Sequence, residues 1–525
     1  MARVLPTLAV ALGVLALGPP AGAQTLRIAK VAQGVLQAGP PEKGVAAFKG
    51  VPFAAPPAGD LRWRAPKAPA AWTGVRKADR FGANCMQVPA GGKGFGPWST
   101  EYVIQDGVAE DCLFLNVWTP ARTAGDKLPV LVWIHGGGFS SGSGSVPIYD
   151  GAAFAKRGVI MVTINYRVGV FGFLAHPALT AEAGTSGNYG LMDQAEALRW
   201  IKANIAAFGG DPARVTIAGQ SAGAASVHEL IAAPSAKGLF ARAIAQSGSG
   251  MGLGTTPRAA AEADGARFAS QAGAKALADL RAMPAEAVLA VRGEGGVPGL
   301  RFAPIIDGVF IRADPNDPAK AASIVPMLTG LTADEASGMN PAYGRVTAAE
   351  LKGQLAGAFG PLSDRAAALY PAADDAEAGL VSRRWARERG LASTVLWAAQ
   401  RQKAGGRPTF VYQFTHVEPG PDAPRYGAFH SSEIPYVYQT LDKSPDRPFT
   451  DADRALSDQM AAYWANFVKG GDPNGPGLPA WPRFDAAEGR ILEIGDHTAA
   501  RAALPPATLS LYHDLAAQGG RMGIF

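Results

Sequence analysis

Short apolar runs, each followed by turn residues and then by a helical pattern, recur through the central part of the chain. Residues 130–134, 159–164 and 214–218 are such runs, and each has the length of a single strand. Residues 191–208 have the pattern of an amphipathic helix that stops at Gly209-Gly210. Apolar strands that alternate with helices are typical of a parallel sheet with both faces covered. The pattern predicts an α/β protein with a large, mostly parallel, doubly wound sheet.

The flanking segments predict edge strands and helical insertions. Residues 26–31 and 45–51 resemble antiparallel edge strands, and residues 410–414 resemble another strand. Residues 259–291 and 348–402 are Ala-rich or helical, the second interrupted by Pro361 and Pro371. Because no Ser/Gly-rich or charged linker separates two cores, we expect residues 24–525 to form one domain with helical insertions near the strand ends.

The N-terminus has the layout of a secretory signal peptide. Arg3 precedes a nearly unbroken apolar stretch at 4–17, and Ala21-Gly22-Ala23 supplies a small-residue cleavage site. We expect residues 1–23 to be removed and the mature protein to be soluble and exported, to the periplasm or the medium. The alternative is a buried N-terminal helix. No later segment sustains an apolar run of membrane length.

Composition narrows the classes of function. Of the 525 residues, 48% are hydrophobic and 18% charged, which fills a sizeable core and excludes wholesale disorder. The net charge of +5 comes without any run of five basic residues, so a nucleic-acid partner is not expected. Cys85 and Cys112 suit one disulfide in an exported chain, or else two buried thiols. No metal is implied, since the chain has only two cysteines and no H-E-x-x-H.

The pattern G-x-S-x-G occurs twice, and its context separates the two matches. Residues 138–142 follow a strand but run into a segment that cannot begin a helix, whereas residues 219–223 lie between a strand and the helical residues 224–233. A nucleophile elbow requires strand, tight turn and helix, because the sharp turn exposes the serine hydroxyl at the sheet edge. Ser221 is therefore the candidate nucleophile, and the alternative is an ordinary Gly-rich turn.

Acyl transfer also needs donors for the developing oxyanion. The amide of Ala222 follows the nucleophile directly, and the glycines after His135, residues 136–138, allow a close approach of backbone to substrate. The alternative is that these three glycines only form a flexible loop.

A serine nucleophile needs a base, and in this kind of fold the order is serine, acid, histidine. His430 lies on a loop after the strand at 410–414 and is the candidate base, although a structural histidine is the alternative. The acid lies between them, and both Asp334 and Glu335 follow the apolar strand at 325–328. Asp307 precedes a glycine and is more simply a turn residue. Spacing alone does not choose between Asp334 and Glu335.

Taken together, the sequence resembles the type-B carboxylesterase family, which includes acetylcholinesterase and bacterial para-nitrobenzyl esterases. Matching stretches recur in order over most of the chain: 48–52 (FKGVP), 110–116 (EDCLFLN), 135–139 (HGGGF), 165–167 (NYR), 187–194 (GNYGLMDQ), 208–212 (FGGDP) and 219–223 (GQSAG).

The resemblance implies an α/β-hydrolase fold and hydrolysis of small-molecule esters without a cofactor. It assigns the nucleophile to Ser221, the base to His430 and the acid to Glu335. The resemblance also assigns the oxyanion donors to Gly137, Gly138 and Ala222, and the family's N-terminal disulfide to Cys85 and Cys112.

Two departures from the cholinesterase-like members bear on the substrate. Gln220 stands where those members have a glutamate, and Trp98 lies further upstream of Cys112 than the tryptophan of their choline site. A quaternary ammonium substrate is therefore not expected.

The sequence thus predicts an exported carboxylic-ester hydrolase. The alternatives are a catalytically silent binding or adhesion module, which typically lacks a member of the triad, and a serine peptidase of related fold. The acyl and alcohol groups and the oligomeric state are not evident from the sequence. Phe302 and Tyr343 are candidates for an apolar substrate site, or for ordinary core packing.

Overall fold

The computed structural model describes residues 25–88, 94–250, 256–291, 300–420, 422–520 and 522–523. The predicted signal peptide, residues 1–23, lies outside the described residues. No helix in the described part of the chain is long and apolar enough to cross a membrane.

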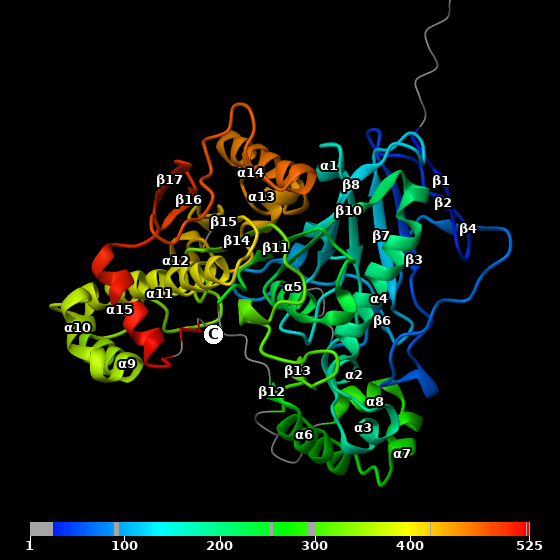
Figure 1. Cartoon of the computed structure of the whole chain (residues 1–525), viewed down its shortest axis with the longest axis horizontal. Coiled ribbons are helices and arrows are strands. Elements are labelled where there is room, and N and C mark those ends of the chain that lie inside the picture. The colour runs from blue at the N-terminus through cyan, green and yellow to red at the C-terminus, as the bar shows by residue number, and fades with distance from the viewer. Residues whose placement is uncertain are drawn as a thin grey trace, which may run out of the picture.

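A ten-stranded mixed sheet organises the chain, with strand order β17-β16-β15-β14-β11-β10-β8-β9-β7-β3 (Figure 1). From β16 to β9 every neighbouring pair is parallel, whereas β7, β3 and β17 pair antiparallel at the two ends. The strands are β3 (Ala46–Pro52), β7 (Phe114–Thr119), β8 (Leu128–Ile134), β9 (Ile160–Ile164), β10 (Gly210–Gln220), β11 (Arg242–Gln246), β14 (Met327–Thr332), β15 (Thr409–Phe414), β16 (Arg490–Ile494) and β17 (Ala499–Ala502). The predicted parallel strands are confirmed.

Three small sheets lie beside the main one. They contain β1 (Ile28–Val31), β2 (Gly34–Ala38) and β4 (Val75–Ala78); β5 (Asn84–Cys85) and β6 (Val108–Ala109); and β12 (Thr256–Pro257) and β13 (Ile305–Ile306). One boundary differs from the expectation: Asp211-Pro212, predicted as a turn, lies inside β10, where the register shifts between Gly210 and Val215. The irregular register lets the proline sit in a strand, because it has no N–H to donate.

Helices cover both faces of the sheet. On one face α4 and α5 pack over β8, β10 and β11, and on the other α13 and α14 form a second apolar cluster (Figure 1). These central helices are α1 (Ala152–Ala155), α2 (Gly169–Phe173), α3 (Pro177–Ala183), α4 (Tyr189–Asn204), α5 (Ala222–Ala232), α12 (Ala423–Tyr426), α13 (Ile434–Tyr438) and α14 (Asp451–Gly470). With helices on both faces, the strands are buried as the apolar runs require.

The predicted helical insertions are also confirmed. They consist of α6 (Arg258–Gln271), α7 (Leu277–Ala282) and α8 (Ala285–Ala290), then α9 (Ala348–Phe359), α10 (Ser363–Leu369) and α11 (Asp375–Lys403), with α15 (Pro506–Ala517) packing on the second group. The breaks near Pro361 and Pro371 fall where proline stops a helix. Figure 1 shows the two groups at separate edges of the molecule.

Cys85 and Cys112 form a disulfide, so the alternative of two free thiols is wrong. The bond ties down the ends of the segment between them, which includes Trp98 and Tyr102. This segment forms one wall of the cavity described below.

Candidate active site

Ser221 lies at a sharp turn between the carboxyl end of β10 and the first residue of α5. Its backbone has φ 59° and ψ −124°, a conformation that a residue with a side chain rarely adopts. The Ser221 amide donates to the carbonyl of Gln246 on the neighbouring strand β11 at 3.0 Å, which anchors the turn. This is the strand–turn–helix geometry predicted for the elbow.

The glycines around Ser221 allow the turn to pack against β8. A Cβ on Gly223 would lie 2.0 Å from the carbonyl oxygen of Ile134, and a Cβ on Gly219 would lie 2.3 Å from that of Gly223. Real Cβ atoms do not approach so closely, so both positions require glycine. The pattern G-x-S-x-G here reflects close backbone packing as well as the bend.

His430 and Glu335 are hydrogen-bonded to each other and both are buried. Glu335 follows β14 by three residues, and His430 lies on the loop after β15, the next strand in the sheet. Nδ1 of His430 contacts Oε2 of Glu335, which leaves Nε2 as the second ring nitrogen. Because the carboxyl ends of parallel strands meet at one edge, two residues 95 positions apart meet here.

The second oxygen of Glu335 is also held. Oε1 accepts from the Ser247 hydroxyl at 2.6 Å and from the Thr332 amide at 2.8 Å. Ser247 follows β11 directly and has a positive φ of 56°. With both oxygens engaged, the carboxylate has a fixed orientation toward His430.

Asp334, the other candidate acid, faces away from His430. It forms a bidentate ion pair with Arg387 of α11, at 2.9 and 2.8 Å, and accepts from the Tyr343 hydroxyl at 2.7 Å. Oδ2 of Asp334 also accepts from the Ala428 amide at 3.0 Å. Asp334 thereby fixes the loop that carries His430, which is a positioning role.

Gln220, just before Ser221, contacts the imidazole. Its Nε2 lies 3.0 Å from Nε2 and 3.3 Å from Nδ1 of His430. The contact therefore brings a neutral amide, and no charge, beside the imidazole. On the other side of the histidine, the indole nitrogen of Trp98 donates to the His430 carbonyl at 2.9 Å.

The loop after β8 has the glycine geometry expected of an oxyanion loop. Gly137 and Gly138 have φ values of 104° and 62°, and the amides of Ser140 and Ser141 both donate to the Gly137 carbonyl. Neither the Gly137 nor the Gly138 amide donates to an acceptor within the described residues. Donors of this kind are available to an incoming oxygen.

His135, at the start of this loop, has a structural role. It stacks on Tyr166 with ring centroids 4.3 Å apart, and its Nδ1 donates to the Gly136 carbonyl at 2.8 Å. Burial lowers the pKa of His135 to about 4, because a charged imidazolium would be desolvated. His135 is therefore neutral at neutral pH.

A cavity of about 460 Å³ opens between these groups. Part of its lining consists of the glycines at 136–138 and of Gln220, Ser221 and His430. The disulfide-bounded segment adds Trp98, Tyr102 and several apolar neighbours. A hollow of this size, mostly apolar with a few polar groups beside a nucleophile, suits a small organic substrate.

The chain matches the model of the carboxylesterase family over residues 28–354 and 384–510. The protein belongs to the carboxylesterase family. Its similarity to known members extends through the sheet and the loops described above.

Known relatives and solved structures support this family assignment. A fumonisin B1 esterase of Sphingopyxis macrogoltabida is 36% identical over 475 residues, which cover 86% of this chain and 84% of that protein. A para-nitrobenzyl esterase of Bacillus subtilis (strain 168) is 36% identical over 467 residues, covering 84% and 90%. The structure of a PNB esterase superimposes with a TM-score of 0.78 at 32% identity, over 93% of this chain and 99% of that one. A carboxylesterase of Geobacillus stearothermophilus gives 0.77 at 34%, over 92% and 99%. The protein has the α/β-hydrolase fold and is a carboxylic-ester hydrolase.

Several residues of this carboxylesterase site were not predicted from sequence. Ser247 carries a weak local signal, since it follows a strand and precedes a glycine, but nothing in the sequence links it to Glu335. Trp98, which lies further upstream than the choline-site tryptophan, nevertheless lines the cavity. Phe302 and Tyr343 do not line it: Phe302 packs against Phe268, and Tyr343 binds Asp334.

A further histidine, the turn residue Asp307 and the second G-x-S-x-G serine have structural roles in the carboxylesterase. His228 is buried on α5, where its Nε2 contacts the Ser249 hydroxyl at 2.9 Å. Asp307 accepts from the amides of residues 309–311, as expected of a turn residue. The second G-x-S-x-G serine, Ser140, donates to the Gly137 carbonyl and begins no helix.

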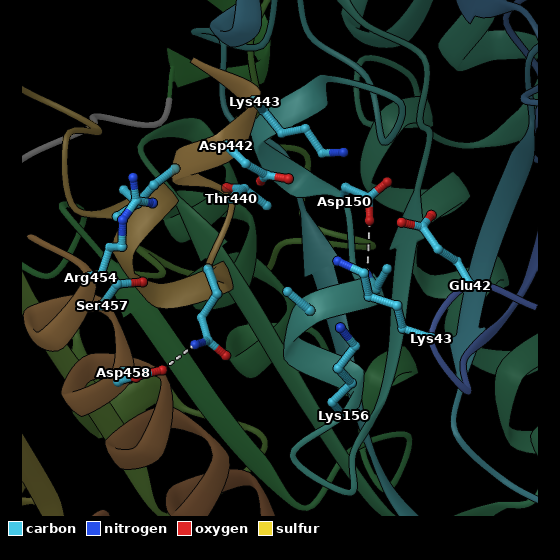
Figure 2. A pocket seen from close by; sticks show the side chains of 14 residues that line it. Glu42, Lys43, Asp150, Lys156, Thr440, Asp442, Lys443, Arg454, Ser457 and Asp458 are labelled. Atoms are coloured by element: carbon cyan, nitrogen blue, oxygen red, sulfur yellow. Dashed lines mark hydrogen bonds between the residues drawn. The ribbon is translucent and has the colours of Figure 1, made fainter. Parts of the chain in front are cut away.

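A second hollow, of about 300 Å³, lies where the segment before β3 meets α1 and α14 (Figure 2). Its lining mixes acidic and basic side chains: Glu42, Asp150, Asp442, Asp458, Lys43, Lys156, Lys443 and Arg454. The hydroxyls there are engaged, since Ser457 donates to the Tyr436 carbonyl and Thr440 to that of Ile148. No histidine is among the residues that line it. This second cavity therefore has no serine–histidine pair among its lining residues, unlike the cavity at Ser221.

Proposed function

We propose that this carboxylesterase cleaves esters through an acyl-enzyme on Ser221, with His430 as the base and Glu335 as the acid that orients it. The observation that carries the proposal is that Ser221, at a strained elbow, and His430, bonded to a buried carboxylate, line the same cavity. The proposal is further supported by the topology, since the three residues follow strands β10, β14 and β15 of one sheet in the chain.

In the proposed first step, the Ser221 oxygen attacks the ester carbonyl carbon while its proton passes to Nε2 of His430. Glu335 stabilises the resulting imidazolium through Nδ1. The carbonyl oxygen becomes an oxyanion that accepts from the amides of Gly137, Gly138 and Ala222. Each such donor typically contributes about 3–4 kcal/mol to the transition state.

The C–O bond to the alcohol then breaks, and the departing oxygen takes the proton from His430. In the second half, His430 removes a proton from water, whose oxygen attacks the acyl carbon. The proton returns to Ser221 as the acid leaves. Water supplies the only further reactant.

The environment of Ala222 supports this assignment. It is the first residue of α5, an eleven-residue helix, so its amide points to the end where the helix dipole favours negative charge. An oxyanion beside this amide gains both a hydrogen bond and the favourable dipole.

Replacement of Ser221 tests the proposal. Ser221→Ala is expected to unfold like the wild type and to lose at least about 10³-fold in kcat on 4-nitrophenyl butyrate. A fluorophosphonate is expected to label the wild type at Ser221. The matched variant Ser140→Ala, which removes the serine of the other G-x-S-x-G stretch, keeps the labelling. If Ser221→Ala retains most of its activity, the assignment is wrong.

The same measurements separate the alternatives. A silent binding module would neither hydrolyse the ester nor react with the fluorophosphonate, and a peptidase would degrade casein. We further propose that residues 24–525 form one catalytic domain and that the protein is exported after cleavage near Ala23. N-terminal sequencing of the mature protein tests the cleavage site.

A further inference from the structure

Among the described residues that line the cavity at Ser221, one has a permanently charged side chain, Arg301. No aspartate, glutamate or lysine is among the residues that line it, and the remaining lining is apolar or neutral apart from the titratable His430 and two tyrosines. On the walls that the described residues form, a bound substrate therefore meets a positive charge and no acidic side chain.

Arg301 has no partner of its own within the described residues. Its side chain is exposed, and it takes part in none of the ion pairs or hydrogen bonds of that part of the chain. Behind Tyr102, Glu101 and Glu418 are paired with Arg447, at 3.4 and 3.3 Å, and do not pair with Arg301. The guanidinium donors of Arg301 remain available to a ligand.

The backbone next to Arg301 is anchored. Phe302 packs edge-on against Phe268 with ring centroids 5.4 Å apart. Further along, the amide and carbonyl of the buried Ile305 are bonded to the side chain of Asn188 at 3.0 and 2.9 Å. Asn188 directly precedes α4, a central helix. Arg301 thus projects into the cavity from a segment fixed to the body of the fold.

The rest of the mouth is apolar. Phe95 and Met339 line the cavity and are themselves exposed, and Phe95 lies against Trp98 with centroids 4.9 Å apart. Such surfaces cover hydrocarbon parts of a substrate. Together with the Arg301 guanidinium, which has no ion pair among the described residues, the cavity suits a ligand that is apolar along its length and anionic at one end.

We propose that the carboxylesterase selects esters that carry a free carboxylate, held by Arg301 while the ester carbonyl faces Ser221. This inference rests on the proposed function, since it concerns the same cavity. A guanidinium binds a carboxylate through two parallel N–H donors, which a neutral group cannot match. A guanidinium binds a carboxylate on the acyl part of the ester as well as one on the alcohol part, so the test includes substrates of both kinds.

The test compares matched substrates that differ only in charge. For the acyl side, monoethyl adipate is compared with the analogue in which the free acid is a carboxamide, and hemiesters with two to six methylene groups extend the series. For the alcohol side, 4-acetoxybenzoate is compared with 4-acetoxybenzamide. The wild type is expected to favour the carboxylate in one arm by about 10-fold in kcat/KM, and the preference falls as salt screens it.

Variants assign the preference to one side chain. Arg301→Gln brings the carboxylate-to-carboxamide ratio to about one, whereas Arg301→Lys retains part of it as a point charge. Arg483→Gln, which removes one exposed positive charge away from the cavity, retains the full ratio. Thermal unfolding and fluorophosphonate labelling verify that each variant is folded and has a competent serine.

The outcomes separate this inference from the proposed function. Hydrolysis of the neutral 4-nitrophenyl butyrate reports on the proposed function alone, and its absence would reject that function. If that ester is cleaved but both arms give a ratio near one in the wild type, the inference about Arg301 is wrong. It is equally wrong if the preference survives in Arg301→Gln.

Discussion

Gly427→Ala perturbs the loop that carries His430 without touching a catalytic group. Gly427 has φ 59° and ψ −145°, and a Cβ added there would lie 2.2 Å from Oδ2 of Asp334. The backbone conformation alone costs about 1–3 kcal/mol for a residue with a side chain. The steric contact adds to this cost, because one of the two groups has to move.

Asp334 is the group that cannot move. Its carboxylate is held by two donors of Arg387, by the Tyr343 hydroxyl and by the Ala428 amide. The loop therefore shifts instead, by about 1 Å if the new contact is to reach the shortest separation that real Cβ atoms adopt. His430 is three residues further on. A misplacement of this size typically costs about 10²-fold in rate.

Steady-state hydrolysis of 4-nitrophenyl butyrate measures the change in kcat, and thermal unfolding measures the change in stability. We expect Gly427→Ala to lose about 100-fold in kcat and at least about 2 kcal/mol in free energy of unfolding. The control is Gly238→Ala, since Gly238 also has a positive φ, 79°, but a Cβ there meets no atom within 4 Å. This control is expected to lose about 1 kcal/mol and no activity. If Gly427→Ala keeps kcat within about threefold of the control, the loop is not positioned through Asp334.

Two further predictions concern charge beneath and beside the site. Burial raises the pKa of Glu433 to about 7 from 4.5, and one of its oxygens has no hydrogen-bond partner within the described residues. Because the folded state holds this proton more tightly, stability falls as pH rises from about 4.5 to about 7. Glu433→Gln should therefore raise the free energy of unfolding by about 1–3 kcal/mol at pH 8 and very little at pH 4.5, in denaturant titrations at both pH values; an equal gain at both would contradict this cause. Gln220→Glu puts a carboxylate about 3 Å from the imidazole of His430, where it stabilises the imidazolium. The midpoint of the acid limb of the kcat/KM against pH profile should rise by about one pH unit. An unchanged midpoint would show that the introduced carboxylate does not contact His430.

Much of the fold was predictable because its signals are local. The buried strands β8, β9 and β10 appear as apolar runs. The 3-10 helix that follows α4, Ile205–Phe208, ends where Gly209 takes a positive φ of 82°. The elbow at Ser221 was equally visible, because strand, turn and helix are consecutive in the chain. The position of Pro212 inside β10 was not, since it depends on an irregular register with the neighbouring strand.

The sequence by itself predicted the strand–turn–helix at Ser221, the glycine loop at 136–138 and the alternation of strands and helices, since each depends on residues adjacent in the chain. Spacing left Asp334 and Glu335 equivalent, and only the family resemblance pointed to Glu335. The tertiary structure supplies the physical difference between the two carboxylates. In the turn that follows β14, the Asp334 carboxylate meets Arg387 and the Glu335 carboxylate meets His430. Packing across the whole sheet decides which strands are neighbours and which side chains meet beside them. The order of residues along the chain does not specify these contacts.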